Sequence, residues 1–453
     1  MSDVKSLNSG QKALFLISVI LAYLAAMFSL TGSAIFVSSA LTSLEGMSMF
    51  GLAITLESLF RAVLIPPAAK LGERFLRKNL FIIGLILFIA GGILCVLAWN
   101  PVIIVISRAV MGFAWGLFFA NMIVMINDVY SPEKAPKING IVQTFGFVGI
   151  LTAGPISGLF VDFMSWHWAM YIVIILSAIS LVLILLVPNV QERADGGLPL
   201  DVAGSLMTAL MLIPFSLALS WGGSMFEWAS PVIIGMLVAA VVFLVVLVLV
   251  ERKAKDPVFP AYLLKDKNLM MIFLIGAMFA GICSVQIYFP TIMQAVLGFT
   301  ATESSIPTTV ISIFALLCTS WVGSRISKTR KVKGLILVEG FICAVSGVLM
   351  LFVGAGTSFI YVVIGFGILG IAQAIHQVTP ISWPSIALDP AKIAVAVAFM
   401  QFGQALASTI FNAVLGATFN VNMLIPLMFI IGFAIVILIC AFAYRDPAQT
   451  NAQ

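Results

Sequence analysis

The chain has 453 residues, of which 62% are hydrophobic and only 9% carry a charged side chain. A soluble domain typically has about 25% charged residues, so this composition excludes a soluble protein and predicts one that crosses a membrane many times. The net charge of +5 does not indicate a nucleic-acid partner, because the basic residues are confined to short segments between apolar runs. The five cysteines lie singly in apolar runs, so we expect neither disulfides nor a metal site.

Apolar runs long enough to cross a bilayer, about 20 residues each, recur along the whole chain. We predict fourteen such spans, with ends set to within a few residues. They lie near 13–38, 48–70, 79–98, 101–126, 139–161, 168–188, 201–221, 230–250, 269–295, 305–323, 333–354, 358–379, 391–417 and 423–443.

The distribution of basic residues predicts the orientation, because Lys and Arg accumulate in cytoplasmic segments of membrane proteins. With the N-terminus inside, 21 of the 23 Lys and Arg residues fall in cytoplasmic segments and none in the outer ones. The remaining two, Arg61 and Arg108, lie within spans. We therefore expect a multi-pass protein of the cell membrane with both termini in the cytoplasm.

The second span and the segment after it carry unusual charges. Glu57 and Arg61 stand one helical turn apart in an apolar run, where they can pair on one helix face. Charges within a span are costly and usually functional, although a structural ion pair is the alternative interpretation. The apolar run ends at AAKLGERFLRK, residues 68–78, which we predict to be a short basic loop.

Spans four and five contain glycines at helical spacing. Span four reads SRAVMGFAWG, in which Gly112 and Gly116 allow a neighbouring backbone to approach closely. Arg108, in the same segment, must find a carboxylate, a backbone acceptor or water. Span five reads GILTAGPISGLF, where a Gly-Pro pair frees a backbone carbonyl and bends the helix.

These segments resemble motifs of the major facilitator superfamily, specifically its fourteen-span drug:proton antiporter group. Residues 69–78 are similar to the superfamily's G-x-L-a-D-R-x-G-R-K loop, with Ala69, Glu73 and Leu76 as departures. The central segments LPLDVAGSLM, LALSWGGS and ERKAKDPVFPAYLLKDKNL are similar to consecutive segments of the fourteen-span group. The resemblance implies a gating role for Leu71, Gly72, Glu73, Arg74, Arg77 and Lys78, proton coupling for Arg108, and an antiporter motif at Gly154, Pro155 and Gly158.

The fold implied by this resemblance is an all-α membrane protein built as two six-helix bundles plus two linker helices. The bundles would span 1–188 and 268–453, with the extra helices and a cytoplasmic linker in 189–267. In such proteins the substrate site lies between the bundles near the middle of the bilayer.

The main departure from the resemblance is in span one. The family has an acid followed by T-I-V-N there, whereas this chain reads FSLTGSAIF, with Ser29 at the acid's position. Either Glu57 has taken over the proton role from a neighbouring helix, or the substrate and the coupling have changed.

Further polar residues lie within the later spans. Glu339, early in span eleven, is a candidate for proton coupling together with Glu57 and Arg108, and it can pair with the basic loop before it. For most of the other polar residues in these spans, a hydrogen bond between helices is the alternative to a role in substrate binding. The candidates for substrate binding are Glu57, Arg61, Gln286, Tyr288, Gln373, His376, Gln377 and Gln401.

The sequence contains no phosphate-binding loop of the G-x-x-x-x-G-K-[ST] type, no H-E-x-x-H and no G-x-S-x-G. We therefore predict a secondary transporter rather than an enzyme, a monomer without a cofactor, whose partners are a small-molecule substrate, protons and the lipid bilayer. One hypothesis is proton-coupled antiport, of efflux type, of amphipathic small organic molecules by alternating access. The other is proton-coupled transport, including uptake, of an organic anion, which Ser29 and the two membrane-embedded arginines favour.

Overall fold

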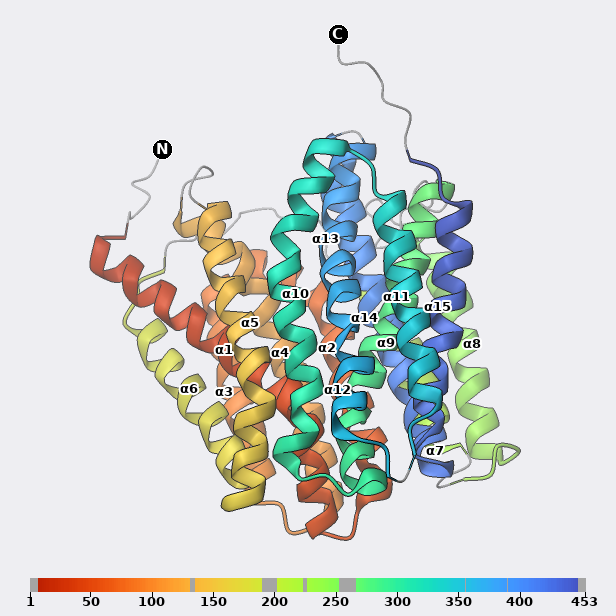
Figure 1. Ribbon diagram of the computed structural model, residues 1–453. Helices are drawn as coiled ribbons and strands as arrows, with labels where there is room; N and C mark the ends of the chain where they lie inside the picture. The colour runs from red at the N-terminus through yellow and green to blue at the C-terminus, as the bar shows by residue number, and fades with distance from the viewer. Residues whose placement is uncertain are drawn as a thin grey trace. The chain divides into compact units, whose positions relative to one another are not determined.

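The protein is almost entirely α-helical over the residues that the computed structural model describes, which are 7–130, 135–189, 202–222, 226–251, 266–354, 356–388 and 390–446 (Figure 1). In this part of the chain the extended pairing is limited to an isolated bridge between Gly222 and Phe226. The expected all-α fold is confirmed.

The chain divides into two compact units, Met1–Val258 and Phe259–Gln453. In the first unit, α1 packs against α5 and α6, α4 packs against α2 and α3, and α7 packs against α2 and α8. The helices of this unit are α1 (Ser9–Ser43), α2 (Phe50–Phe75), α3 (Arg77–Val96), α4 (Pro101–Val129), α5 (Ala135–Phe163), α6 (His167–Leu185), α7 (Val202–Trp221) and α8 (Pro231–Glu251), with the 3-10 helix η1 (Met47–Met49) before α2.

In the second unit, α9 packs against α14 and α15, α11 packs against α15 and α13, and α10 packs against α13. Its helices are α9 (Lys267–Leu297), α10 (Ala301–Thr329), α11 (Lys333–Leu351), α12 (Phe359–Gly367), α13 (Leu369–Ala387), α14 (Pro390–Val421) and α15 (Ile425–Ala443). Helices α7 and α8 belong to the first compact unit, so this division into two units differs from the predicted division into two bundles and a linker. The functional division into 1–188, 189–267 and 268–453 stays a prediction.

Polar residues at helix starts explain several boundaries. Asn8 accepts a hydrogen bond from the backbone N–H of Gln11 and begins α1, and Asn100 does the same for Val102 just before Pro101 opens α4. Thr300 and Glu303 form a reciprocal capping box at the start of α10. These short polar segments end the apolar runs, so the sequence pattern and the helix starts agree.

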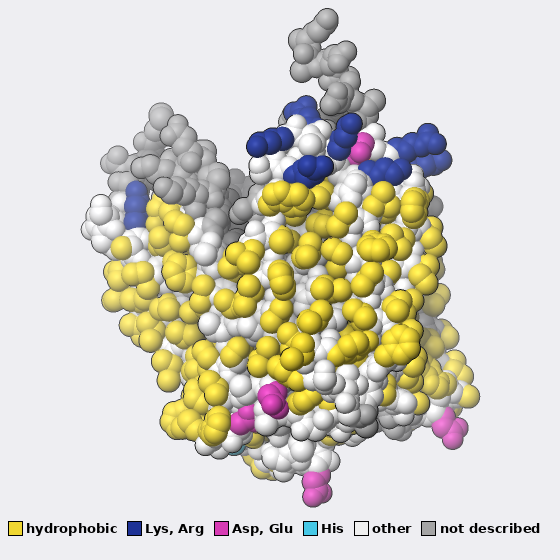
Figure 2. Space-filling view, viewed as in Figure 1, with side chains coloured by type: hydrophobic (Ala, Val, Ile, Leu, Met, Phe, Trp, Pro, Cys, Tyr) yellow, Lys and Arg dark blue, Asp and Glu magenta, His cyan; other side chains and the backbone are white. Residues whose placement is uncertain are grey.

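Apolar side chains cover the outside of the helices as well as the inside. In α8, Val238, Val241 and Val245 are each more than half exposed in the protein alone, as expected for a helix face that lipid covers. On the face drawn in Figure 2, hydrophobic side chains form the middle band, while most Lys and Arg lie at one end of the helices and most Asp and Glu at the other. We call these the basic and the acidic ends.

Twelve helices within the described residues are long and apolar enough to cross a membrane. The expected spans 201–221 and 391–417 correspond to α7 and α14, whose described apolar stretches are shorter, Leu210–Leu219 and Leu406–Phe419. The count of fourteen spans therefore stays a prediction.

One predicted boundary is wrong. The basic segment after span two is not a loop, because α2 continues to Phe75 and α3 starts at Arg77. The chain turns at Leu76, whose φ of 67° lies in the region that favours glycine. The expected span 358–379 agrees with the candidate membrane span Phe359–Pro380. It is divided at Ile368 into α12 and α13, and α13 continues through Pro380 to Ala387.

Candidate functional site

Helices α2 and α4 approach each other unusually closely at two glycines. A Cβ atom on Gly112 would lie 2.2 Å from the carbonyl oxygen of Glu57, and one on Gly116 would lie 2.9 Å from that of Arg61. Such distances are far below van der Waals contact, so only glycine permits this packing. The glycines of span four therefore set the register that brings the charged residues of α2 next to α4.

The central feature of this contact is a buried ion pair between Glu57 of α2 and Arg108 of α4. Oε2 of Glu57 accepts hydrogen bonds from Nη2 of Arg108 at 2.5 Å and from Nε at 3.1 Å. The side chain of Arg108 is fully buried, whereas that of Glu57 is 8% exposed. Both bonds end on one carboxylate oxygen, and no described residue donates a hydrogen bond to Oε1.

The other contacts of Arg108 come from α1 and from its own helix. Nη1 donates to Oγ of Ser29 at 3.2 Å and to Sδ of Met111 at 3.5 Å. The guanidinium carbon lies 5.5 Å from the ring centroid of Phe36. Ser29 stands at the position where the family motif has an acid, so that position does face Arg108, but the acid itself comes from Glu57 on α2.

Arg61 does not pair with Glu57, contrary to the expectation from their i,i+4 spacing. Its guanidinium carbon lies 4.8 Å above the ring of Trp115 on α4, and within the described residues Arg61 makes no hydrogen bond or ion pair. The carboxylate of Glu57 is turned toward Arg108, which offers it two N–H donors, while Arg61 lies over the aromatic face. Sequence spacing identified the charged residues but assigned the wrong partner.

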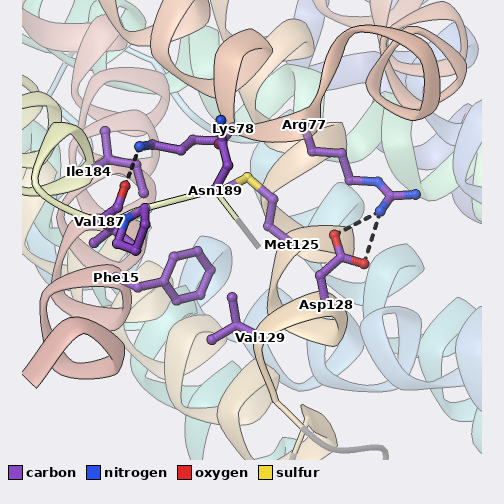
Figure 3. Close-up of a pocket in the computed structure, with 10 residues that line it drawn as sticks. Phe15, Arg77, Lys78, Met125, Asp128, Val129, Ile184, Val187 and Asn189 are labelled. Atoms are coloured by element: carbon purple, nitrogen blue, oxygen red, sulfur yellow. Dashed lines mark hydrogen bonds and ion pairs between the residues drawn. The ribbon is translucent and has the colours of Figure 1, made fainter. Parts of the chain in front are cut away.

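A second ion pair lies at the basic end of the first unit (Figure 3). Nη1 of Arg77 donates to both carboxylate oxygens of Asp128 at 2.9 and 2.7 Å, joining the start of α3 to the end of α4. Nζ of Lys78 donates to the carbonyl oxygen of Val187, beyond the end of α6. The pocket between these helices is lined by Phe15, Arg77, Lys78, Met125, Asp128, Val129, Ile184, Val187, Pro188 and Asn189.

These contacts bear on the predicted gating segment. Arg77 bonds to α4 and Lys78 to the segment after α6, and Asp128 is a partner that sequence reasoning missed. Gly72 lies directly against Asn121 of α4, because a Cβ there would be 1.9 Å from Oδ1 of Asn121. Leu71 is half-buried in α2. The side chains of Glu73 and Arg74 lie outside the described residues.

The predicted antiporter motif lies within an unbroken helix. Pro155 falls inside α5 without ending it, and Gly154 and Gly158 are buried. Next to them, Oγ of Ser157 lies so close to Gly32 of α1 that a Cβ on that glycine would be 2.7 Å away. The motif thus lies where α5 packs against α1.

The second unit has a buried acid of its own, Glu339 of α11. Its Oε1 lies 3.7 Å from Nδ1 of His376 on α13, which is longer than a hydrogen bond. Neither carboxylate oxygen has a hydrogen-bond partner among the described residues. The imidazole of His376 stacks on Phe279 of α9 at 4.3 Å. Glu339 therefore faces a histidine of another helix, and not the basic loop that precedes α11.

The remaining candidates of this unit differ in their surroundings. Nε2 of Gln286 donates to Oε1 of Gln373 at 3.4 Å, joining α9 to α13. Tyr288 is fully buried and donates to the backbone carbonyl of Asn412 at 2.9 Å, which favours a bond between helices over a substrate contact. Gln377 is half-buried. The side chain of Gln401 lies outside the described residues.

A multi-pass bundle of apolar helices that buries an ion pair and a second acid facing a histidine has the architecture of an integral membrane transporter. The model of the Major Facilitator Superfamily matches residues 19–412, and the chain belongs to this family. It is accordingly a membrane transporter of small molecules and not an enzyme.

Two relatives from Bacillus subtilis (strain 168) are similar over much of the chain. The multidrug transporter protein MdtP is 27% identical over 383 residues, which cover 83% of this chain and 70% of that protein. Multidrug resistance protein 3 is 28% identical over 280 residues, covering 61% of this chain and 54% of that protein. The match to the second relative thus spans about half of its length.

Solved structures show the same fold at low sequence identity. A POT family transporter in complex with 5-aminolevulinic acid has a TM-score of 0.71 at 17% identity, covering 96% of this chain and 95% of that one. The nucleoside transporter NupG has a TM-score of 0.65 at 15% identity, covering 95% and 98%. These similarities confirm the major facilitator fold.

Proposed function

We propose that this protein is a proton-coupled secondary transporter of efflux type, which exchanges protons for amphipathic small organic molecules by alternating access. The observation that carries the proposal is the buried ion pair between Glu57 and Arg108. An ion pair held away from water adds little net stability over apolar residues of similar size. Its presence among apolar helices therefore favours a functional role.

Protonation of Glu57 would change the contact between α2 and α4. The ionised carboxylate holds two donors of Arg108 on a single oxygen. A proton on Glu57 removes that negative charge and leaves the fully buried guanidinium with uncharged partners only, among them Ser29 and Met111. Because an unmatched buried charge is costly, protonation favours a rearrangement of the two helices, which is what coupling requires.

The titratable groups around Glu57 are few. Arg61 on α2, Arg108 on α4 and Cys95 on α3 interact with it electrostatically, and the described part of α7 contributes no acidic or basic side chain.

Further features support the proposal at the scale of the fold. The basic ends of the helices, placed in the cytoplasm by the positive-inside rule, carry the Arg77–Asp128 pair, which would break and re-form as α3 and α4 move. Relatives that are multidrug transporters favour efflux across the cell membrane. Glu339 would be a second proton site, and we expect the protein to work as a monomer in the bilayer.

Everted membrane vesicles test the proposal directly. An imposed proton gradient should drive accumulation of members of a panel of cationic, neutral and anionic amphipathic dyes in vesicles that contain the wild-type protein. Glu57→Gln should abolish this gradient dependence at equal expression, because the amide cannot exchange a proton. Glu45→Gln, at an exposed acid next to η1, is the matched control and should behave as wild type. Gradient-driven accumulation by Glu57→Gln at the wild-type level would contradict the proposal.

A further inference from the structure

Arg61 is a cation in an apolar helix, and no described acidic side chain forms an ion pair with it. The side chain is partly buried in α2, and among the described residues it forms neither a hydrogen bond nor an ion pair. Glu57 and Arg108 interact with it electrostatically, but Oε2 of Glu57 accepts its hydrogen bonds from Arg108, at 2.5 and 3.1 Å. A guanidinium has five N–H donors, and those of Arg61 are available to a ligand.

The aromatic ring beneath Arg61 also lacks a hydrogen-bond partner. Nε1 of Trp115 is buried and has no acceptor within the described part of the chain. An indole N–H is a donor only, and a buried donor without an acceptor is unfavourable. The guanidinium of Arg61 and Nε1 of Trp115 therefore lie together on adjacent helices as two donors without acceptors. A negatively charged acceptor would satisfy both.

Trp115 begins a run of stacked rings that crosses from α4 to α1. Trp115 and Phe119 stack with centroids 4.6 Å apart and planes at 7°, and Phe119 stacks on Tyr23 of α1 at 5.7 Å and 24°. We call Trp115, Phe119 and Tyr23 the aromatic ladder. Trp115 and Phe119 are partly exposed, so their faces and edges can receive an aromatic ligand.

The charges of this region favour one sign of ligand. Arg61 and Arg108 carry two positive charges and Glu57 one negative charge, which leaves a net charge of +1 on the three side chains. In surroundings of low dielectric constant such an excess attracts an anion and repels a cation.

We propose that Arg61 and Nε1 of Trp115 bind the anionic group of an aromatic organic acid, whose ring system packs against the aromatic ladder. The planar guanidinium matches a carboxylate or sulfonate with two parallel hydrogen bonds. The inference rests on the proposed transport function, because it names the class of substrate that the first unit recognises. It makes Arg61 a specificity-determining residue and assigns Glu57 and Arg108 to coupling.

Equilibrium binding to the purified full-length protein tests this site without any proton gradient. The probes are 2-naphthylacetic acid, its uncharged methyl ester and 2-naphthylethylamine, which share the ring system and differ in charge. The wild-type protein should bind the acid at least tenfold more tightly than the ester and the amine. Arg61→Gln should remove this preference while leaving the affinity for the ester unchanged.

Two further variants separate charge from hydrogen bonding. Trp115→Phe keeps a stacking ring but removes the N–H, so it should reduce the preference for the acid a few-fold. Arg61→Lys keeps the charge but lacks the planar guanidinium, so it should retain part of the preference for the acid. This variant replaces Arg61→Gln in the test if Arg61→Gln does not fold. Arg325→Gln is the matched control, because Arg325 also lies over a tryptophan ring, that of Trp321 at 5.9 Å, at the exposed end of α10. It should bind all three probes as wild type does.

A wild-type protein without preference for the acid, or an Arg61→Gln variant that keeps the preference, would overturn the inference. Replacement of gluconate by chloride in the buffer distinguishes the source of the anion. If chloride abolishes acid binding and the naphthyl ring adds no affinity, the site binds inorganic anions only and the inference is wrong. A protein that prefers the acid but shows no gradient-driven transport would contradict the proposed coupling alone.

Discussion

Arg108 is held by polar side chains from two other helices, and only Glu57 is an acid. Ser29, on α1, reaches the guanidinium with a hydroxyl at 3.2 Å, while Glu57, on α2, reaches it with a carboxylate at 2.5 Å. Both positions are therefore within reach of one cation. An acid at either of them can hold Arg108, and this chain has placed its acid on α2.

This geometry predicts that the acid can be moved back to α1. Glu57→Gln should lose gradient-driven transport, and the double substitution Ser29→Asp with Glu57→Gln should recover a substantial part of it, because the new carboxylate lies next to Nη1 of Arg108. Transport in everted vesicles is the measurement. Ser29→Asn with Glu57→Gln is the control, since it has nearly the same shape without the charge. Equal recovery by the Asn variant, or none by the Asp variant, would contradict the exchange of roles.

The partners of individual residues were the part that the sequence could not supply. Charge in an apolar run identified Glu57, Arg61 and Arg108 as a group. Their pairing depends on which side chains meet across α2 and α4, and periodicity gives the face of a helix but not its neighbour. Asp128 was missed for the same reason, because it follows a predicted span as one acid among ordinary loop residues. The repeated glycines of span four were the available signal for the contact with α2.

At the scale of the helices, Gly112 determines how close α2 and α4 can lie. Gly112→Ala should lower the thermal stability of the detergent-purified protein, because its Cβ would lie within 2.2 to 2.8 Å of backbone atoms of Glu57. Overpacking of this kind costs about 1–3 kcal/mol. The displacement of α2 should also weaken proton coupling, since it separates Arg108 from its acid.

Gly235→Ala in α8 is the matched control for this substitution. A Cβ on Gly235 meets nothing within 4 Å, and alanine is a better helix former than glycine by about 1 kcal/mol. The unfolding temperature of Gly235→Ala should be equal to that of the wild type or higher. Equal unfolding temperatures for the two variants would show that the close contact at Gly112 has no energetic role.

Helix positions could be predicted well, and helix ends less well. Hydrophobic runs place α3, α4, α6 and α15 within a few residues, because a bilayer-length apolar run has one favourable structure. Residues 68–75 are helical although the sequence predicts a loop there, because charged residues mark the end of the hydrophobic run and not the end of the helix. Backbone hydrogen bonding continues through the basic residues to Phe75. The break between α12 and α13 falls in an apolar run, where composition carries no signal.

At the scale of the whole molecule, each of the two units has its own buried acid. Glu57 in the first unit is neutralised by an arginine, and Glu339 in the second faces a histidine at 3.7 Å. Among the described residues, Cys283 of α9 and Cys343 of α11 also interact electrostatically with Glu339. The described residues of α12 and α15, which pack on α11, contribute no acidic or basic side chain.

This arrangement predicts that Glu339→Gln changes pH dependence without loss of stability. The amide removes a buried titratable group whose two oxygens lack hydrogen-bond donors within the described chain, and a neutral amide costs less to bury than a carboxylate without donors. The unfolding temperature should therefore equal or exceed that of the wild type, while the pH profile of transport loses one ionisation. His376→Gln should alter the same part of the pH profile, because its imidazole lies 3.7 Å from Oε1 of Glu339. A wild-type pH profile in both variants would leave Glu339 a structural residue and Glu57 the acid that couples transport to protons.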